Sequence, residues 1–414
     1  MTFKQFSKQQ MRIFNWWTLE RWDAVIADGA IRSGKTMCMS ISFVLWAMHS
    51  YRHQTFAFCG KTIESLRRNV IIPLLGYYLN GLYQFKENRT QNFFEVSDGQ
   101  TTNRFYLFGG KDESSAALIQ GITLAGVMLD EVALMPRSFV EQAIARCSIA
   151  GSKFWFNCNP ENPLHWFYTE WIQKAQQKNA LYLHFRMEDN LSLSPEIRAR
   201  YEALYTGVFY DRYILGIWKP AEGLIYPEQA NGKNIVSSVE RDYTTWYISV
   251  DYGTMNPCSM GLWGKSGGSW YRVKESYYDG RSKQKPLTDE EYYSRLESLA
   301  GERNIRAVIV DPSAASFIAC IRHHGRFRVQ KAQNAVLDGI RLTASKFQDE
   351  TIQICDCCAD TIRELGSYRW EEKSDMDKPV KENDHAMDDI RYFVATVLGG
   401  NRAVIRSKTA LGIY

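Results

Sequence analysis

The sequence lacks any long hydrophobic run. Its most apolar stretches are short and interrupted by polar residues. None approaches the roughly 20 residues that a helix needs to cross a bilayer. Residues 1–17 mix Lys, Gln and Arg with aromatic side chains and contain no continuous apolar core. We therefore expect neither a membrane-spanning helix nor a signal peptide.

Neither positive nor negative charge is in large excess. The chain has 50 Lys and Arg against 46 Asp and Glu, a formal net charge of +4, with no polybasic or acidic tail. This balance permits a nucleic-acid partner but does not require one. The 45% hydrophobic and 14% aromatic content exclude disorder over the whole chain. A length of 414 residues predicts about two or three domains.

Cysteines are few and odd in number. There are nine, scattered among predicted strands and helices, which indicates a reducing cytosol rather than a disulfide framework. Residues 355–358 read Cys-Asp-Cys-Cys and lack the paired C-x₂-C spacing of a zinc site. Residues 321–331 form a basic cluster with an aromatic residue, which is equally consistent with a grip on DNA phosphates and with a solvated surface.

Strands and helices alternate in two regions of the chain. The first region predicts a mainly parallel sheet covered on both faces, with an antiparallel hairpin at residues 92–108. Its predicted strands are 24–27, 55–59, 126–129 and 153–157, and its helices are 35–50, 63–79 and 136–146. The second region has predicted strands 246–250, 260–263, 270–277 and 307–310, and helices 289–299 and 384–398.

A segment rich in glycine and proline separates the two regions. Residues 215–232 hold three Gly and two Pro. We therefore predict an α/β chain with a first domain at residues 1–214, a linker at 215–236 and a second domain at 237–414.

A phosphate-binding loop follows the first predicted strand. Residues 29–36 match the full pattern G-x-x-x-x-G-K-[ST] between a strand and a helix, which is the context the motif requires. Its backbone N–H groups and the helix N-terminus would bind the phosphates of ATP. Lys35 would reach the β- and γ-phosphates, and Thr36 would hold Mg²⁺. The candidate nucleotide-binding residues of the loop are Gly29, Arg32, Ser33, Gly34, Lys35 and Thr36.

Two adjacent carboxylates end another apolar strand. Asp130 would bind Mg²⁺ through water, and Glu131 would polarise the attacking water. Such a pair suits hydrolysis better than simple nucleotide binding.

Several polar residues near this loop have two interpretations each. Arg32 could stabilise charge on the γ-phosphate, or it could point into solvent. Asn157 or Asn159 could sense phosphate or water, or they could form an Asx-type turn before Pro160. Gln10 could read adenine through its amide, or it could lie on the surface.

The second region carries carboxylates that suit a metal centre. Asp251 and Asp311 each follow an apolar strand, and His385 and Asp388 share one face of the last predicted helix. Carboxylates from three separate elements can hold one or two Mg²⁺ or Mn²⁺ ions. Their order along the chain is the one expected of a ribonuclease-H-like nuclease. Glu275 ends another strand and is a secondary candidate.

A P-loop ATPase followed by a metal nuclease resembles the large terminase subunit of tailed bacteriophages and prophages. The resemblance covers nearly the whole chain, and the order of its motifs is highly specific. The motifs are Phe6-Ser7-x-x-Gln10, Gly29–Thr36, Gln120–Val127 before Asp130-Glu131, Asn157-x-Asn159-Pro160, Gly216-Ile217-Trp218 with Glu222-Gly223, Asp251-Tyr252-Gly253, Asp311 and His385–Asp388.

The resemblance implies a two-part activity. The first domain would use ATP to translocate double-stranded DNA into procapsids, and the second would cut concatemeric DNA. The implied partners are DNA, the portal protein, the small terminase subunit and further copies of the chain in a ring on the procapsid. The isolated chain is expected to be a monomer. The expected location is the cytoplasm of the infected host and not the mature virion.

The resemblance also implies roles for individual residues. Asp251, Asp311 and Asp388 would bind the nuclease metals, with His385 close by. Asp389 stands where the family commonly has a small residue, so Asp388 and Asp389 could exchange roles. In the first domain, the loop residues and the acidic pair take the roles given above.

Two other functions stay open at this point. One is a P-loop helicase or repair ATPase fused to a nuclease, although no second helicase lobe follows residue 160. The other is a DNA-binding assembly protein whose second site has lost catalysis.

Overall fold

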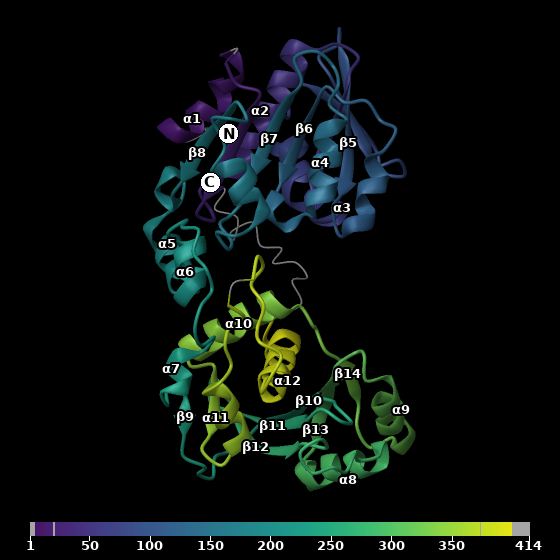
Figure 1. Cartoon of the computed structure of the whole chain (residues 1–414), viewed down its shortest axis with the longest axis vertical. Coiled ribbons are helices and arrows are strands. Elements are labelled where there is room, and N and C mark those ends of the chain that lie inside the picture. The colour runs from purple at the N-terminus through teal and green to yellow at the C-terminus, as the bar shows by residue number, and fades with distance from the viewer. Residues whose placement is uncertain (1–4, 20, 373, 400–414) are drawn as a thin grey trace. The chain divides into compact units, whose positions relative to one another are not determined.

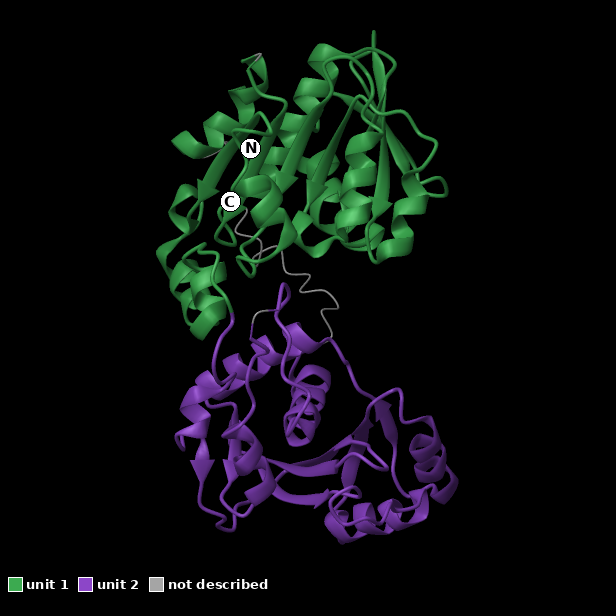
Figure 2. Cartoon of the chain, in the orientation of Figure 1, with its two compact units in different colours: residues 1–220 green, residues 221–414 purple. Residues whose placement is uncertain are grey.

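The chain folds into two compact units, Met1–Pro220 and Ala221–Tyr414 (Figure 2). The computed structural model describes residues 5–19, 21–372 and 374–399. No helix in these ranges is both long enough and apolar enough to cross a membrane.

The first unit is built on one sheet of eight strands (Figure 1). The strands are β1 (Ala24–Gly29), β2 (Thr55–Gly60), β3 (Gln84–Asn88), β4 (Phe93–Ser97), β5 (Thr102–Gly109), β6 (Gly126–Asp130), β7 (Lys153–Asn157) and β8 (Ala180–Phe185). Their order in the sheet is β3-β4-β5-β2-β6-β7-β1-β8. All pairs from β5 to β8 are parallel, whereas β3–β4 and β4–β5 are antiparallel. The predicted parallel sheet and its antiparallel hairpin are confirmed.

Helices cover both faces of this sheet. They are α1 (Lys8–Asn15), α2 (Lys35–Ser50), α3 (Ile63–Leu66) and α4 (Arg137–Ala145), whereas α5 (Pro195–Glu202) and α6 (Gly207–Tyr213) follow the last strand and pack near Ala30. Successive side chains of a strand point to opposite faces. Val25 of β1 therefore shares one buried core with Phe43 of α2, and Ile26 shares the other with Phe139 of α4. Burial on both faces explains why these strands are continuous apolar runs.

The predicted helix at residues 63–79 is interrupted. It consists of α3 followed by two π-helical segments, Arg67–Ile71 and Leu74–Tyr78. Pro73 lies between them and has no N–H group to donate, which breaks the regular α-helical hydrogen bonding.

The second unit contains a mixed sheet of seven strands in the order β14-β13-β10-β11-β12-β15-β9. The strands are β9 (Ile235–Val236), β10 (Thr245–Asp251), β11 (Cys258–Ser266), β12 (Ser269–Tyr278), β13 (Ile305–Val310), β14 (Val329–Lys331) and β15 (Ile352–Cys355). Strands β10, β11 and β12 are antiparallel neighbours, and the outer pairs are parallel.

Helices again cover the two faces of the sheet. They are α7 (Pro227–Ala230), α8 (Asp289–Ala300), α9 (Ala315–His324), α10 (Val336–Gln348), α11 (Ala359–Leu365) and α12 (His385–Phe393), the last continued by a π-helical segment at Val394–Leu398. On one face Phe393 of α12 stacks on Trp263 of β11, with ring centroids 4.2 Å apart. On the other face Leu296 of α8 and Phe317 of α9 pack with Val250 of β10.

The segment expected as a linker, residues 215–236, contains part of the second unit. That unit begins at Ala221. Helix α7 and strand β9 lie within the segment, and β9 pairs in parallel with β15.

Candidate functional sites

The phosphate-binding loop connects β1 to α2, as the motif requires. Gly29 has a φ of 120°, and a Cβ there would lie 2.0 Å from the backbone oxygen of Phe185. Gly34 has a φ of 84° and precedes α2, whose N-terminus has no side-chain cap. The first N–H groups of α2 therefore remain available to an anion.

Lys35 lies across this loop and is 6% exposed. Its Nζ atom donates to the carbonyl oxygens of Gly29 (3.0 Å) and Ala30 (2.7 Å) and to Oδ1 of Asn159 (3.2 Å). It also lies 3.3 Å from Oγ of Ser33, which is itself buried. Burial lowers the pKa of Lys35 to about 8. A phosphate group would favour the charged form of this lysine, because nearby negative charge raises its pKa.

Thr36, Asp130 and Asn157 form a hydrogen-bonded group at the start of α2. Oγ1 of Thr36 donates to Asp130 Oδ1 at 3.2 Å. Nδ2 of Asn157 donates to Thr36 Oγ1 at 2.8 Å and also to the Asp130 carboxylate. Burial raises the pKa of Asp130 against these hydrogen bonds. Oδ1 of Asn157 is buried with no hydrogen-bond partner among the described residues, so the group has an acceptor to offer to a ligand.

Glu131 follows this group with unusual backbone geometry. It is partly buried and has a φ of 57°, in the left-handed region that residues other than glycine rarely adopt. Arg32 in the loop also has a positive φ, of 59°. Residues held in such conformations cluster at functional sites.

Gln10 and Arg32 contact protein groups in this structure. Nε2 of Gln10 donates to the backbone oxygen of Ser33 at 3.3 Å, and its Oε1 accepts from the backbone N–H of Ser7 at 3.0 Å. Gln10 is 3% exposed, so the surface interpretation was wrong. The guanidinium of Arg32 lies over the ring of Tyr201, 5.0 Å from its centroid, while Arg32 itself is exposed.

Asp28 is a buried residue beside the loop that the sequence did not single out. It lies on β1 directly before Gly29 and is completely buried. It accepts a hydrogen bond from Nε1 of Trp218 at 2.6 Å and lies 3.0 Å from Nδ1 of His184. Trp218 belongs to the segment that leaves the first unit, so Asp28 ties that segment to the base of the loop. The sequence feature that could have identified Asp28 is the presence of an aspartate in an otherwise apolar strand.

In the second unit, two predicted carboxylates meet at one tyrosine. Asp251 is the last residue of β10, and Asp311 directly follows β13. Strands β10 and β13 are parallel neighbours in the sheet. The hydroxyl of Tyr392 on α12 lies 2.8 Å from Asp311 Oδ2 and 3.4 Å from Asp251 Oδ1. His385 Nδ1 lies 2.8 Å from Asp251 Oδ2. No role for Tyr392 was predicted from the sequence, although Tyr392 lies one helical turn after Asp388.

Asp388 joins this group through charged side chains. Its Oδ1 lies 2.9 Å from Nη2 of Arg391, and its Oδ2 accepts from Nζ of Lys381 at 3.2 Å. Arg391 also donates to Oδ1 of Asn334 at 2.9 Å, and Nδ2 of Asn334 donates to Asp311 at 2.7 Å. The three carboxylates are thus linked by hydrogen-bonded side chains rather than packed in mutual contact. Lys381, Asn334 and Arg391 were not predicted, since nothing in their local sequence marks them.

The pKa values of Asp251 and Asp311 are shifted in opposite directions by the surroundings of each carboxylate. Burial raises the pKa of Asp251 to about 6, although His385 acts in the opposite direction. Burial also acts to raise the pKa of Asp311, but hydrogen bonds from Ser313 and Tyr392 outweigh it and the pKa is lowered. Burial disfavours the charged form of Asp251, and a positive charge nearby would favour it.

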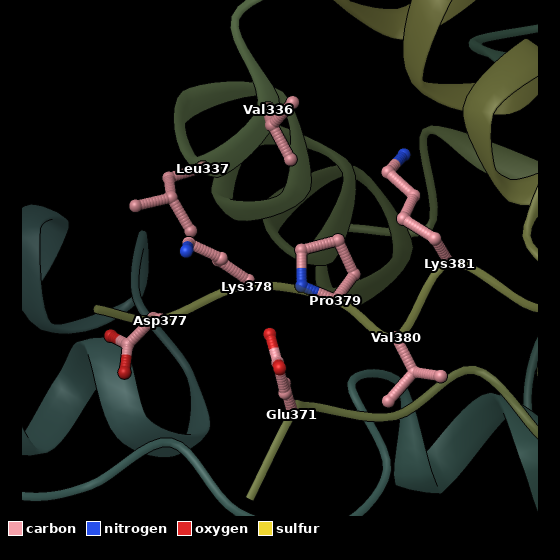
Figure 3. Close-up of a pocket in the computed structure, with 8 residues that line it drawn as sticks. All are labelled: Val336, Leu337, Glu371, Asp377, Lys378, Pro379, Val380 and Lys381. Carbon is pink, nitrogen blue, oxygen red and sulfur yellow. The ribbon is translucent and has the colours of Figure 1, made fainter. Parts of the chain in front are cut away.

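A pocket of about 410 Å³ lies beside this group. Figure 3 shows residues 377–381 passing along the start of α10, with Glu371 on the opposite side. Its lining residues are Val336, Leu337, Glu371, Asp377, Lys378, Pro379, Val380 and Lys381. Lys381 is the lining residue that also contacts Asp388.

Asp389 and Glu275, the secondary candidates for metal ligands, instead accept hydrogen bonds from protein groups. Asp389 is completely buried and accepts hydrogen bonds from Arg272, Ser249 and Ser259. Its carboxylate therefore has no place for a metal, which favours Asp388 as the ligand. Glu275 accepts from the backbone N–H groups of residues 360 (2.7 Å) and 361 (3.2 Å). It caps the start of α11.

The cysteine run also has structural contacts. Sγ of Cys357 lies 3.2 Å from the backbone oxygen of Val273, and Sγ of Cys358 lies 3.3 Å from that of Arg272. All nine cysteines lie in the described ranges and are free thiols. The basic stretch 321–331 covers the end of α9 and strand β14, and Arg326 within it pairs with Glu297 at 3.1 Å.

Comparisons with known proteins place this chain next to phage proteins. The family model described as "Terminase large subunit, T4likevirus-type, N-terminal" matches residues 26–231. A solved structure of the large terminase from a thermophilic bacteriophage is 51% identical, covers 96% of this chain and 100% of that chain, and has a TM-score of 0.90. The complex of that protein with ADP is 50% identical over 95% of this chain and 100% of that one, with a TM-score of 0.88. The complex with ATP-γ-S is 50% identical over 96% and 100%, with a TM-score of 0.87. No curated protein matches.

Proposed function

Because the chain belongs to the terminase large subunit family and functions in phage DNA packaging, we propose that it combines two enzymatic activities. The first unit hydrolyses ATP to move double-stranded DNA into procapsids. The second unit cuts concatemeric DNA with the help of metal ions. The fold class, a P-loop α/β unit followed by a ribonuclease-H-like unit, is that of the family.

The group of Thr36, Asp130 and Asn157 supports the ATPase proposal. It places a hydroxyl, a carboxylate and an unpaired amide oxygen at the N-terminal end of α2, where phosphates bind. These oxygen donors fit Mg²⁺. Thr36 and Asp130 would hold the ion, and Asn157 would orient Asp130 and the water around it. When bound, Mg²⁺ neutralises charge on the β- and γ-phosphates.

Lys35 and Glu131 have distinct tasks in this proposal. Lys35 exchanges its bonds to the loop carbonyl oxygens for bonds to phosphate oxygens. Glu131 accepts a proton from the attacking water or orients that water. Arg32 can assist at the γ-phosphate only after leaving the ring of Tyr201. The adenine contact of Gln10 and the phosphate-sensing role of Asn159 stay predictions.

Phosphate release from Mg²⁺-ATP tests the ATPase proposal. We expect Glu131→Gln to lower the rate at least about a hundredfold, because general-base catalysis contributes about 10²–10⁴-fold. Glu141→Gln is the matched control, since Glu141 is an exposed partner of Arg137 in the same unit. A Glu131→Gln variant with the wild-type rate would contradict the assignment.

The connected carboxylates of the second unit support the nuclease proposal. Asp251, Asp311 and Asp388 offer only hard oxygen donors, which suit Mg²⁺ or Mn²⁺. Lys381 already places one positive charge against Asp388. Such ions, when bound, activate water and stabilise the phosphodiester transition state. Within the protein, His385 orients Asp251, and Tyr392 holds the two strand carboxylates in position.

Plasmid cleavage without ATP tests the nuclease proposal. We expect cutting with Mn²⁺ or Mg²⁺ and none with EDTA. Asp388→Asn should remove the activity, whereas Asp375→Asn, an exposed aspartate of the same unit, should not. Absence of metal-dependent cutting by a chain that hydrolyses ATP would contradict the nuclease half. It would favour a catalytically silent second site.

The partners and location follow from the family and belong to the same proposal. They are double-stranded DNA, the portal protein, the small terminase subunit and further copies of the chain in a ring on the procapsid. The setting is the host cytoplasm rather than the mature virion. The isolated chain is proposed to be a monomer, and light scattering should give a mass near 47.8 kDa. The helicase alternative loses its basis, because the likeness to the thermophilic phage terminase covers both units.

A further inference from the structure

Three side chains of different chemistry meet between helices α8 and α9. Glu290 lies in the first turn of α8, and Cys320 and His324 lie on α9. Sγ of Cys320 donates to Glu290 Oε1 at 3.6 Å, and Nε2 of His324 lies 2.8 Å from Glu290 Oε2. In the described part of the chain, this is the one group of three or more Cys, His, Asp or Glu residues whose ligand atoms all lie within 4.8 Å of one another.

The surrounding structure fixes this arrangement. Cys320 and His324 are four residues apart and therefore share one face of α9. The ring of Tyr293 stacks on the His324 imidazole, with centroids 3.8 Å apart and planes at 7°. Leu296 of α8 and Phe317 of α9 lie in one buried core. The two helices thus hold the three side chains close together without a bound ion.

The ligand types point to a soft divalent metal. Thiolate, imidazole and carboxylate are the groups that bind Zn²⁺ in proteins, whereas Mg²⁺ prefers oxygen alone. Tetrahedral bonds of about 2.0–2.3 Å separate ligand atoms by about 3.3–3.8 Å. One ligand atom from each of the three residues lies within 4.8 Å of the other two, so shifts of about 1 Å bring the three atoms to this geometry. Glu290 and His324 are exposed and Cys320 is partly buried, so a fourth position is open to water.

We propose that Glu290, Cys320 and His324 bind one Zn²⁺ ion and thereby join α8 to α9. Cys320 loses its thiol proton to solvent and binds as the thiolate. The imidazole of His324 binds through Nε2 and carries its proton on Nδ1.

Titration of the untagged full-length chain with Co²⁺ tests this site. Co²⁺ bound to a thiolate gives sulfur-to-metal charge-transfer absorption in the near ultraviolet. We expect this absorption to saturate at one Co²⁺ per chain, to persist in excess Mg²⁺ and to disappear when Zn²⁺ is added. Cys320→Ser should abolish it. Cys357→Ser should leave it unchanged, because Cys357 is an exposed cysteine elsewhere in the same unit.

A second variant tests the site if Cys320→Ser does not fold. Glu290→Gln keeps the size of an exposed side chain, and it should weaken Co²⁺ binding at least about tenfold. Circular dichroism identifies the variants that are folded. The proposal is overturned if the wild type shows no absorption, if folded Cys320→Ser retains it, if Cys357→Ser removes it, or if Glu290→Gln binds Co²⁺ as tightly as the wild type.

Discussion

Replacing Asp389 by alanine should strongly destabilise the second unit. The side chains of Asp389 and Arg272 are both 0% exposed and form an ion pair. The variant leaves the Arg272 guanidinium buried with Glu275, at 3.5 Å, as its remaining carboxylate. Removing one partner of a buried pair costs about 3–5 kcal/mol. We expect a loss of about 3 kcal/mol, at the low end, because Glu275 still compensates part of the charge.

Urea unfolding followed by circular dichroism measures this loss. Domains are stable by about 5–15 kcal/mol, so the expected change is a large share of the total. Asp338→Ala is the control, because Asp338 pairs with Arg341 on the surface with 72% of its side chain exposed. It should cost less than about 1 kcal/mol. The double variant Arg272→Met, Asp389→Leu should be more stable than Asp389→Ala, because it removes the buried guanidinium together with Asp389, while Glu275 keeps its bonds from the N–H groups of residues 360 and 361. A loss below about 1 kcal/mol in Asp389→Ala would show that the buried Arg272 guanidinium does not depend on Asp389.

Three further changes test the α11 cap, the proposed ATPase site and the proposed nuclease site. Glu275→Ala should lower the free energy of unfolding by at least about 1 kcal/mol, because it removes the α11 cap and also a carboxylate beside Arg272, while a variant equal to the wild type would contradict the capping role. Asn157→Ala should lower the ATPase rate about 10–100-fold, because Asn157 orients Asp130 at the proposed Mg²⁺ position, and an unchanged rate would contradict that role. The pKa of Asp251 is raised to about 6, so its carboxylate ionises as pH rises through that value. Initial rates of Mn²⁺-dependent cutting should fall about tenfold per pH unit below about 6 and level off above it, and a flat profile would contradict this.

Features encoded by adjacent residues could be predicted from the sequence. The strand, loop and helix around residues 24–50 are local, and α2 begins and ends at the residues expected. The mainly parallel pairing of the first sheet followed from the alternation of apolar runs with helices. Asp251 and Asp311 were found because each directly follows an apolar strand.

Features that join distant residues could not be predicted. Asp388 and Asp389 are adjacent carboxylates, and only the position of Arg272, 117 residues away in the chain, decides which of them is buried as an ion pair. Glu275 was expected at a strand end, but it lies within β12, and the α11 N–H group that it caps, at residue 360, is 85 residues later. Trp218 and Asp28 are separated by 190 residues, so no local pattern indicates their hydrogen bond.

We propose that one chain carries two separable catalytic sites. The most direct measurement compares ATP hydrolysis and Mn²⁺-dependent plasmid cutting in the folded Lys35→Ala and Asp311→Ala variants. We expect that Lys35→Ala loses ATP hydrolysis and keeps DNA cutting, and that Asp311→Ala loses DNA cutting and keeps ATP hydrolysis. Loss of both activities in either folded variant would contradict the division into two sites.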